Sequence, residues 1–378
     1  MAKKFWPYNR KYFPELQCTM KSPVNPLPNR TEISQLGEFG LIDYLTKNIR
    51  LQNSTSLKGV GDDAAVIAAD NRQTLVSVDV LIEGVHFDLS YTPLKHLGYK
   101  AVAVNISDIA AMNGKAEQIV VGIGLSNRFP VEAIEEIYEG MMLACKRYQV
   151  DLVGGDTTSS HSGLFISVTV IGKAKQEEIC YRGGASVGDL LCVSGDLGAA
   201  YMGLLLLERE KAAFKANPDM QPDLEGYDYI LERQLKPEPR TDVVEMLKQA
   251  GIKPTSMIDI SDGLASEILH LCKASSLGCR IYEDKIPMDA ATLTMAESFR
   301  IVPTVAALNG GEDYELLFTI RQTDFEKVKA ISNISIIGHF TEQSGIAEMV
   351  TTDNQLIRLT AQGWDALKNS EEDKKADL

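Results

Sequence analysis

The chain has 378 residues, of which 44% are hydrophobic and 24% charged, and its formal net charge at pH 7 is −14. A chain of this length is expected to form two domains, each with a sizeable core. The negative charge argues against a nucleic-acid partner or an anionic membrane surface, because both need a basic protein face.

The cysteines and the apolar segments exclude further classes of protein. The six cysteines form no Cys-x-x-Cys pair and no zinc-type pattern with the five histidines. Structural zinc is therefore not expected, and a reduced, cytoplasmic compartment is the expectation. No apolar stretch reaches the roughly 18 residues that a membrane-spanning helix needs. Residues 1–30 are interpreted as an N-terminal extension without an assigned function.

The first half of the chain predicts an α/β domain over residues 31–172. In chain order, the patterns indicate a helix at 33–50, strands in "AAVIA" and "TLVSVDVLI", a small-residue helix in "HLGYKAVAVNISDIAAM", an amphipathic helix at 131–148, and strands in "VDLVGGDTT" and "LFISVTVIG".

A polar stretch near residues 172–190 marks the expected domain boundary, and a C-terminal α/β domain is predicted over 173–369. Residues 207–240 are charged and contain several prolines, which indicates a helix and a surface insertion. "TSMIDISDGLASEILHL" reads as strand, sharp bend and helix, and "LNGGEDYELLFTI" as a glycine turn that leads into a strand. Residues 370–378 are expected to form a frayed tail.

Six aspartates share one kind of position, in or at the end of an apolar segment: Asp63, Asp79, Asp108, Asp156, Asp259 and Asp262. Each has a structural alternative, for example Asp262 as a helix N-cap and Asp156 as a turn residue. A lone carboxylate on a buried face costs several kcal/mol unless it is paired, and no basic residues stand nearby in sequence to neutralise six. We therefore predict that several Mg²⁺ ions bind to the group. Asp62, beside Asp63, is interpreted as a turn or outer-sphere residue.

Phosphoryl transfer is the reaction that such a set of carboxylates favours, because it depends on positioning and on charge neutralisation by metal ions. The sequence has neither a G-x-x-x-x-G-K-[ST] phosphate loop nor a His-Arg-Asp kinase loop. Taken alone, the residues predict a metal-dependent phosphate enzyme outside the common nucleotide-binding folds.

Six motifs in this order resemble the thiamine-monophosphate kinase family, which belongs to the aminoimidazole-ribonucleotide-synthetase-like superfamily: "GVGDDAAVI", "SVDVLIEGVHF", "KAVAVNISDIAAMNG", "LVGGDTT", "IDISDGL" and "GGEDYELLFT". The resemblance implies transfer of the γ-phosphoryl group of ATP to thiamine monophosphate, which yields thiamine diphosphate. It also implies an N-terminal domain that forms a β-barrel across a homodimer, and a C-terminal α/β domain packed beside it.

The same resemblance implies roles for individual residues. The metal ligands would be Asp63, Ser77, Asp79, Asp108, Asp156, Asp259 and Asp262. The ATP contacts would be Tyr138, Gly155, Asp156, Arg182 and Ser261, and the contacts with the phosphate acceptor His86, Glu312 and Trp364. Val78 stands where many members have threonine, so a metal contact there would have to come from its backbone carbonyl or would be lost.

Structural alternatives remain for these side chains, and rival functions for the chain. His86 could be a packed histidine, Trp364 a C-terminal staple, Glu312 a turn residue and Arg182 a solvated linker residue, although an arginine beside two glycines suits a phosphate. The alternative functions are another ATP-dependent enzyme of the superfamily or a non-catalytic metal- or nucleotide-binding regulator. A hydrogenase-maturation dehydratase would require a C-terminal cysteine, and no cysteine follows Cys279 in this sequence. A selenophosphate synthetase would require an N-terminal Cys-Lys pair, whereas Cys18 precedes a threonine.

The expected mechanism is direct in-line transfer without a covalent intermediate. The acceptor is a phosphate monoester with a second pKa of about 6, so its oxygen is already anionic near pH 7. No protein base is then required.

Overall fold

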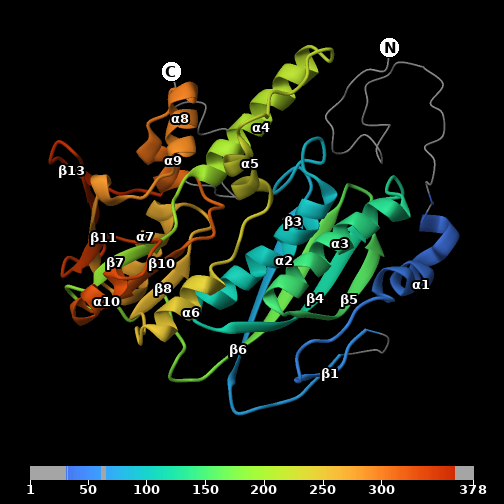
Figure 1. The fold of residues 1–378 in the computed structure, drawn as a ribbon, viewed down its shortest axis with the longest axis horizontal. Coiled ribbons are helices and arrows are strands. Elements are labelled where there is room, and N and C mark those ends of the chain that lie inside the picture. The colour runs from blue at the N-terminus through green and yellow to red at the C-terminus, as the bar shows by residue number, and fades with distance from the viewer. Residues whose placement is uncertain (1–30, 32, 61–64, 362–378) are drawn as a thin grey trace.

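The structure, a computed structural model, describes residue 31 and residues 33–60 and 65–361. Two large sheets, each with its own helices, lie side by side (Figure 1). One has four strands and comes from the first half of the chain, and the other has seven strands and comes from the second half. A small two-stranded sheet pairs β1 (Ser56–Lys58) with β2 (Val66–Ile67).

The four-stranded sheet has the order β3-β6-β4-β5. Its strands are β3 (Gln73–Ile82), β6 (Phe165–Ala174), β4 (Lys115–Leu125) and β5 (Asp151–Ser159). Neighbouring strands are antiparallel except for β4 and β5, which are parallel. Helices α2 (Leu94–Ala111) and α3 (Val131–Tyr148) cover one face, and α1 (Ile33–Thr46) lies at the β5 end (Figure 1).

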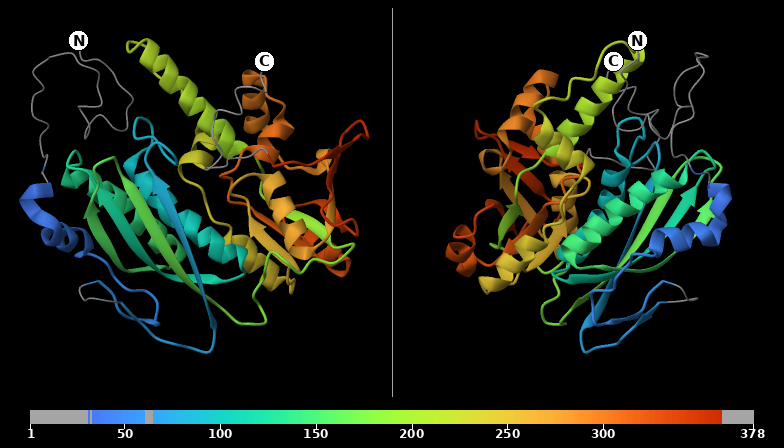
Figure 2. Two further views of the ribbon diagram at one scale, coloured as in Figure 1. Left: turned by 180° about the vertical axis from the view of Figure 1, so that it is seen from behind. Right: turned by 45° about the vertical axis from the view of Figure 1, so that its right-hand side comes forward.

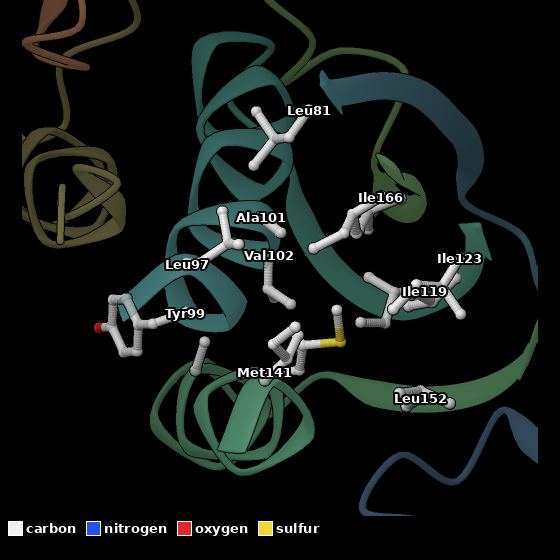
Figure 3. Packing of buried hydrophobic residues seen from close by; sticks show 14 of the residues in the cluster. Leu81, Leu97, Tyr99, Ala101, Val102, Ile119, Ile123, Met141, Leu152 and Ile166 are labelled. Atoms are coloured by element: carbon white, nitrogen blue, oxygen red, sulfur yellow. The ribbon is translucent and has the colours of Figure 1, made fainter. Parts of the chain in front are cut away.

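The core of this domain lies between the sheet and helices α2 and α3. Figure 3 shows Leu97, Val102 and Met141 of the helices facing Ile119 and Ile166 of the sheet. The helices pack closely because glycines meet at their crossing. A Cβ atom at Gly98 would lie 1.9 Å from the Ile137 carbonyl oxygen, and one at Gly140 1.9 Å from the Lys95 carbonyl oxygen. The small residues of the predicted helix thus permit this contact.

No helix among the described residues covers the opposite face of the four-stranded sheet, which we call its open face. Side chains along β3 alternate, so that Leu81 is buried under α2 while Val76, Val78, Val80 and Ile82 are exposed. In the left view of Figure 2, the strands lie in front of α2 and α3. Among the strands that the structure describes, β3 and β5 are the two edges of this sheet, which does not close into a barrel within the described part of one chain.

The seven-stranded sheet has the order β13-β12-β9-β11-β7-β10-β8. Its strands are β7 (Leu190–Ser194), β8 (Ser256–Asp259), β9 (Gly278–Tyr282), β10 (Leu316–Ile320), β11 (Ile334–Thr341), β12 (Ala347–Val350) and β13 (Leu356–Arg358). All neighbours are antiparallel except β9 and β12.

Helices cover both faces of this second sheet. Leu317 of β10 packs with α7 (Leu264–Ser275) and α9 (Pro303–Asn309). Its neighbours Leu316 and Phe318 point the other way, toward α6 (Thr241–Gln249) and α10 (Phe325–Lys329). Helices α4 (Ala199–Ala216), α5 (Asp228–Leu235) and α8 (Ala290–Phe299) form a further cluster, and α4 projects from the body of the molecule (Figure 1).

Several elements differ from the sequence-based expectation. The central strand β4 was not among the predicted strands, and the first helix ends at Thr46 rather than at residue 50. Between the two large sheets, β6 ends at Ala174 and β7 begins at Leu190, so the expected polar stretch near residues 172–190 leads into a new strand. Within the described ranges, no helix is long and apolar enough to span a membrane.

Candidate active site

A pocket of about 330 Å³ lies where the two large sheets meet. It is lined by Thr74–Ser77 of β3, by Asp108, Ile109 and Ala111 of α2 with Met112 after it, by Arg182, and by Met257–Asp259 of β8. Four of the predicted site residues therefore lie together in the pocket wall: Ser77, Asp108, Arg182 and Asp259.

Hydrogen bonds fix the carboxylates of this pocket. Ser77 Oγ donates to Asp108 Oδ2 at 2.5 Å, which joins β3 to α2. Ser107 Oγ donates to Asp259 Oδ2 at 2.6 Å, which joins α2 to β8. The Asn105 side-chain oxygen accepts from the backbone N–H of Asp79 at 3.1 Å. The two serines thus orient the carboxylates of Asp108 and Asp259, and Asn105 holds the backbone at Asp79.

Burial makes these carboxylates hard to ionise. It raises the pKa of Asp79 to about 6, with a further contribution from the negative charge of Asp108. It raises the pKa of Asp259 to about 7, again with repulsion from Asp108. Burial also raises the pKa of Asp108, although the Ser77 hydroxyl and the Arg182 guanidinium oppose the shift. Three acidic groups that repel one another create a demand for a cation.

The conformation of the chain around Arg182 brings this side chain to the pocket. The Tyr181 carbonyl accepts a hydrogen bond from the Met257 N–H at 3.0 Å, so the segment lies beside β8. Gly184 has a φ of +136° and Gly183 lies against the Ala274 backbone, where a Cβ atom would be 2.7 Å from the Ala274 carbonyl oxygen. The glycines therefore permit the turn that leaves Arg182 as an exposed cation facing Asp108.

Two turns that are distant in sequence meet at the end of β8. The N–H of Glu312 donates to the Ser261 carbonyl at 2.7 Å, and the N–H of Tyr314 donates to the Ile260 carbonyl at 2.8 Å. Gly311, with a φ of +69°, permits this approach. Ser261 and Asp262 thus lie beside Glu312, and the Asp262 N–H donates to the buried Glu267 carboxylate at 3.1 Å.

A second polar cluster surrounds Glu312. Its Oε2 atom accepts from Lys100 Nζ of α2 and from Gln234 Nε2 of α5, both at 2.8 Å. His86 lies within the electrostatic reach of this cluster: burial lowers its pKa, Glu312 raises it and Lys100 lowers it. The His86 Nδ1 atom accepts from the Ile82 N–H at 3.1 Å. His86 and Glu312, the two predicted acceptor contacts that the structure describes, therefore belong to one cluster.

Tyr314 connects the two clusters. Its pKa is raised well above the usual value by burial and by Glu312, Asp79, Asp259 and Asp108. The backbone gives the geometric connection, because Tyr314 follows Glu312 by two residues and its N–H donates to the carbonyl of Ile260, the residue after Asp259 of the pocket wall. The Glu312 cluster therefore adjoins the β8 end of the pocket.

Three of the predicted site residues, Gly155, Asp156 and Tyr138, do not line the pocket. Asp156 and Gly155 are on β5, at the opposite edge of the sheet from β3, about 14 Å away over three strand spacings. The ladder partners Asp156, Gly122, Ser167 and Val80 share the open face of the sheet, whereas Asp79 faces α2. Gly155 lies against the β4 backbone, where a Cβ atom would be 2.1 Å from the Val121 carbonyl oxygen.

Tyr138 of α3 packs against the N-terminal core, and burial raises its pKa to about 12. It does not line the pocket. Two more predicted residues, Asp63 and Trp364, lie outside the described residues, as does Asp62.

The donor chemistry around the pocket suits Mg²⁺. Over residues 65–361 and the shorter described ranges before them, no group of three or more His, Cys, Asp or Glu side chains could hold a metal ion. Mg²⁺, however, is usually bound through one or two carboxylates, with waters and substrate phosphates as the other ligands. Ser77, Asp108 and Asp259 supply hard oxygen donors to the pocket. A bound cation would favour the ionised form of the two carboxylates, which burial disfavours, so the residues present fit this ion.

The sequence-based prediction missed several functional side chains. Asn105 and Ser107 orient predicted ligands, and Lys100 and Gln234 hold Glu312. A signal was available for three of them, because Lys100, Asn105 and Ser107 are polar residues within an otherwise buried, small-residue helix. Gln234 lies in the charged 207–240 segment and carries no such signal.

Comparisons with known proteins agree over nearly the whole chain. Residues 61–174 match the model of the AIR synthase related protein, N-terminal domain, and residues 186–351 match that of the C-terminal domain. The chain is 34% identical over 339 residues to thiamine-monophosphate kinase of Bacillus subtilis, which covers 88% of this chain and 100% of that protein. It is 33% identical over 315 residues to the enzyme of the same name from Aquifex aeolicus, covering 83% and 94%.

A solved structure of AaThiL complexed with AMPPCP and TMP has a similar fold. The TM-score is 0.69 at 31% identity, and the match covers 93% of this chain and all of that one.

Proposed function

Because the chain belongs to the thiamine-monophosphate kinase family, it transfers the γ-phosphoryl group of ATP to thiamine monophosphate, and we propose that the transfer takes place between the pocket and the Glu312 cluster. The product is thiamine diphosphate. The observation that carries the proposed location is that the turn with Glu312 is hydrogen-bonded to Ile260 and Ser261, directly after Asp259 of the pocket wall.

The proposal assigns the nucleotide phosphates to the end that contains Arg182 and Asp108. Arg182 is an exposed guanidinium with five N–H donors, which suits phosphate oxygens. Ser261, in the turn after β8, is assigned to the same nucleotide. Tyr138 and Gly155 remain proposed ATP contacts on the family resemblance alone, since neither lines this pocket.

We further propose that Ser77, Asp79, Asp108, Asp259 and Asp262 hold Mg²⁺ together with Asp63 and Asp156. Mg²⁺ bound there would neutralise the charge of the transferred phosphoryl group. The residues of the chain keep the carboxylates in place: Ser77 orients Asp108, and Ser107 orients Asp259.

The acceptor is assigned to the end that contains His86 and Glu312, with Trp364 as a third contact. Thiamine monophosphate needs no base, because its phosphate is already ionised near pH 7. The lowered pKa of His86 keeps its imidazole neutral at that pH, so it presents an aromatic face and a hydrogen-bonding edge without adding positive charge. Direct in-line attack by the acceptor phosphate is the mechanism that these groups support.

A homodimer is proposed on the open face of the four-stranded sheet. Val76, Val78, Val80 and Ile82 form an exposed apolar row on β3, and water-exposed rows of this kind favour a protein partner. A second copy that completes a barrel with this face would cover the row. The Asp156 side chain lies on the same face, so its proposed role in metal binding depends on the second copy in the proposed dimer.

Incubation with ATP, Mg²⁺ and a panel of acceptors tests the function, with the products identified by mass. We expect thiamine diphosphate from thiamine monophosphate and no phosphorylation of free thiamine, because an alcohol requires a base to take its proton. Absence of thiamine diphosphate would contradict the function, and efficient phosphorylation of free thiamine would contradict the base-free mechanism.

A further inference from the structure

Residues of both domains hold the Glu312 carboxylate through one of its oxygens and leave the other oxygen open to a ligand. Lys100 Nζ and Gln234 Nε2 both donate to the same oxygen, Oε2, at 2.8 Å. Among the residues that the structure describes, none donates a hydrogen bond to Oε1 of Glu312. The Glu312 side chain is 28% exposed, so Oε1 is accessible to a ligand.

The two donors are themselves fixed. The Lys100 side chain is only 4% exposed, and its Nζ also donates to the Gln234 backbone carbonyl at 3.2 Å. Gln234 is buried at the C-terminal end of α5. A buried lysine is expensive unless its charge is paired, and here the pair is Glu312. Lys100 therefore requires Glu312 to stay anionic and to keep one orientation.

The backbone of Glu312 adds to this fixation. Its φ of +58° is uncommon for a residue with a side chain, and its N–H donates to Ser261. The neighbouring Asp313 accepts from the N–H groups of Gly198 and Ala200 at the start of α4. The turn that carries Glu312 is thus held on both sides, so the direction of Oε1 is set before a ligand arrives.

We propose that Lys100 and Gln234 are positioning residues that hold Glu312 Oε1 as a fixed acceptor for the amino group of the pyrimidine ring of the substrate. This inference rests on the proposed function, because it concerns the acceptor end of that site. An anionic acceptor with one open oxygen suits an N–H donor, and thiamine monophosphate offers such a donor in its aminopyrimidine. Lys100 and Gln234 contact Glu312 rather than the substrate, so they act through it.

The test compares thiamine monophosphate with the analogue in which oxygen replaces the pyrimidine amino group. The wild-type chain should prefer the amino compound in kcat/KM by about 10- to 100-fold, the value of one hydrogen bond to a charged group. Lys100→Met and Gln234→Met should each reduce that preference, raise the KM for thiamine monophosphate and leave the KM for ATP unchanged. Glu312→Gln should reduce the preference in the same way.

A double-mutant cycle separates positioning from direct contact or general damage. Lys100→Met combined with Glu312→Gln should lose no more than Glu312→Gln alone, because Lys100 acts through Glu312. Lys211→Met is the matched control, since Lys211 of α4 also pairs with carboxylates, those of Asp88 at 2.7 Å and Glu208 at 2.9 Å. It should keep the wild-type preference for the amino compound.

Each outcome decides the question. Additive losses in the cycle, or an unchanged preference in both Lys100→Met and Gln234→Met, would overturn the inference while the proposed function stands. Equal rises in both KM values with a lower melting temperature would show a purely structural role and would also overturn it. A wild-type chain that does not phosphorylate thiamine monophosphate would overturn the proposed function and this inference together. Should Lys100→Met fail to fold, Gln234→Met carries the same comparison.

Discussion

Ser107 and Asp259 lie 152 residues apart in sequence and are joined by a 2.6 Å hydrogen bond between the Ser107 hydroxyl and the Asp259 carboxylate. Both residues are buried. Ser107 lies in α2, which packs on the four-stranded sheet, and Asp259 ends β8 of the seven-stranded sheet. Asp108, the next residue of α2, is therefore set at a fixed position relative to β8. The spacing of the acidic groups is a property of the contact between the two halves of the chain.

The acidic groups of the pocket should be essential for turnover. We expect Asp79→Asn or Asp108→Asn to lower kcat by about 100-fold or more, because even the outer partners of metal ligands are worth roughly 10- to 100-fold. Steady-state kinetics at saturating Mg²⁺ measures this, and circular dichroism checks the fold. Asp219→Asn, at an exposed position, should behave as wild type. Near-normal turnover in either the Asp79 or the Asp108 variant would exclude a shared metal role.

Asp259 should make the metal-free chain less stable as pH rises. Its folded-state pKa of about 7 lies above the usual value of 3.8, so the folded chain binds more protons than the unfolded chain between these values. The protonated group contributes fully below pH 4, and this contribution is lost as pH rises through 7. Asp259→Asn removes the ionisation and can still accept the Ser107 hydrogen bond.

Thermal unfolding in EDTA at pH 5 and pH 8 tests this sign. The Asp259→Asn variant should be more stable than wild type at pH 8, by about 1 kcal/mol or more, with a smaller difference at pH 5. Asp219→Asn should show no such pH-dependent gain. A variant that is less stable than wild type at pH 8 would mean that the Asp259 carboxylate is paired rather than strained in the metal-free chain.

The open face of the four-stranded sheet should mediate dimer formation. Val80→Lys places a charge in the apolar row of β3, and we expect a dimer at micromolar concentration to become a monomer. Light scattering measures the mass. Val305→Lys in α9 is the matched control, because Val305 is 46% exposed and Val80 is 42% exposed. Dissociation of both variants, or of neither, would place the interface elsewhere.

Arg182 should bind the nucleotide rather than the acceptor. Arg182→Met removes a cation from the pocket, and we expect the KM for ATP to rise by about tenfold or more, the value of one charge-assisted hydrogen bond. The KM for thiamine monophosphate should stay near the wild-type value. Arg321→Met, at another exposed arginine, is the control. A selective rise in the KM for the acceptor would move Arg182 to the other end of the site.

The sequence by itself determined the local elements that carry the motifs. "IDISDGL" predicted a strand, a bend and a helix, and the structure has β8 ending at Asp259 and α7 beginning at Leu264. The glycine turn before "YELLFTI" leads into β10 as expected. These features follow from short-range rules, because side-chain periodicity and glycine conformations depend on neighbours within a few residues. The same motifs carried the family resemblance, which the comparisons confirmed.

Tertiary structure alone decided which of these residues meet. Lys100 pairs with Glu312 across 212 positions, and no local pattern links the two. Asp156 and Asp79 were expected in one group, yet strand order and the alternation of side chains put them at opposite edges and on opposite faces of one sheet. Pairing of this kind depends on burying the apolar faces of whole elements against one another, so it is set by the packing of the chain and not by the spacing of its motifs.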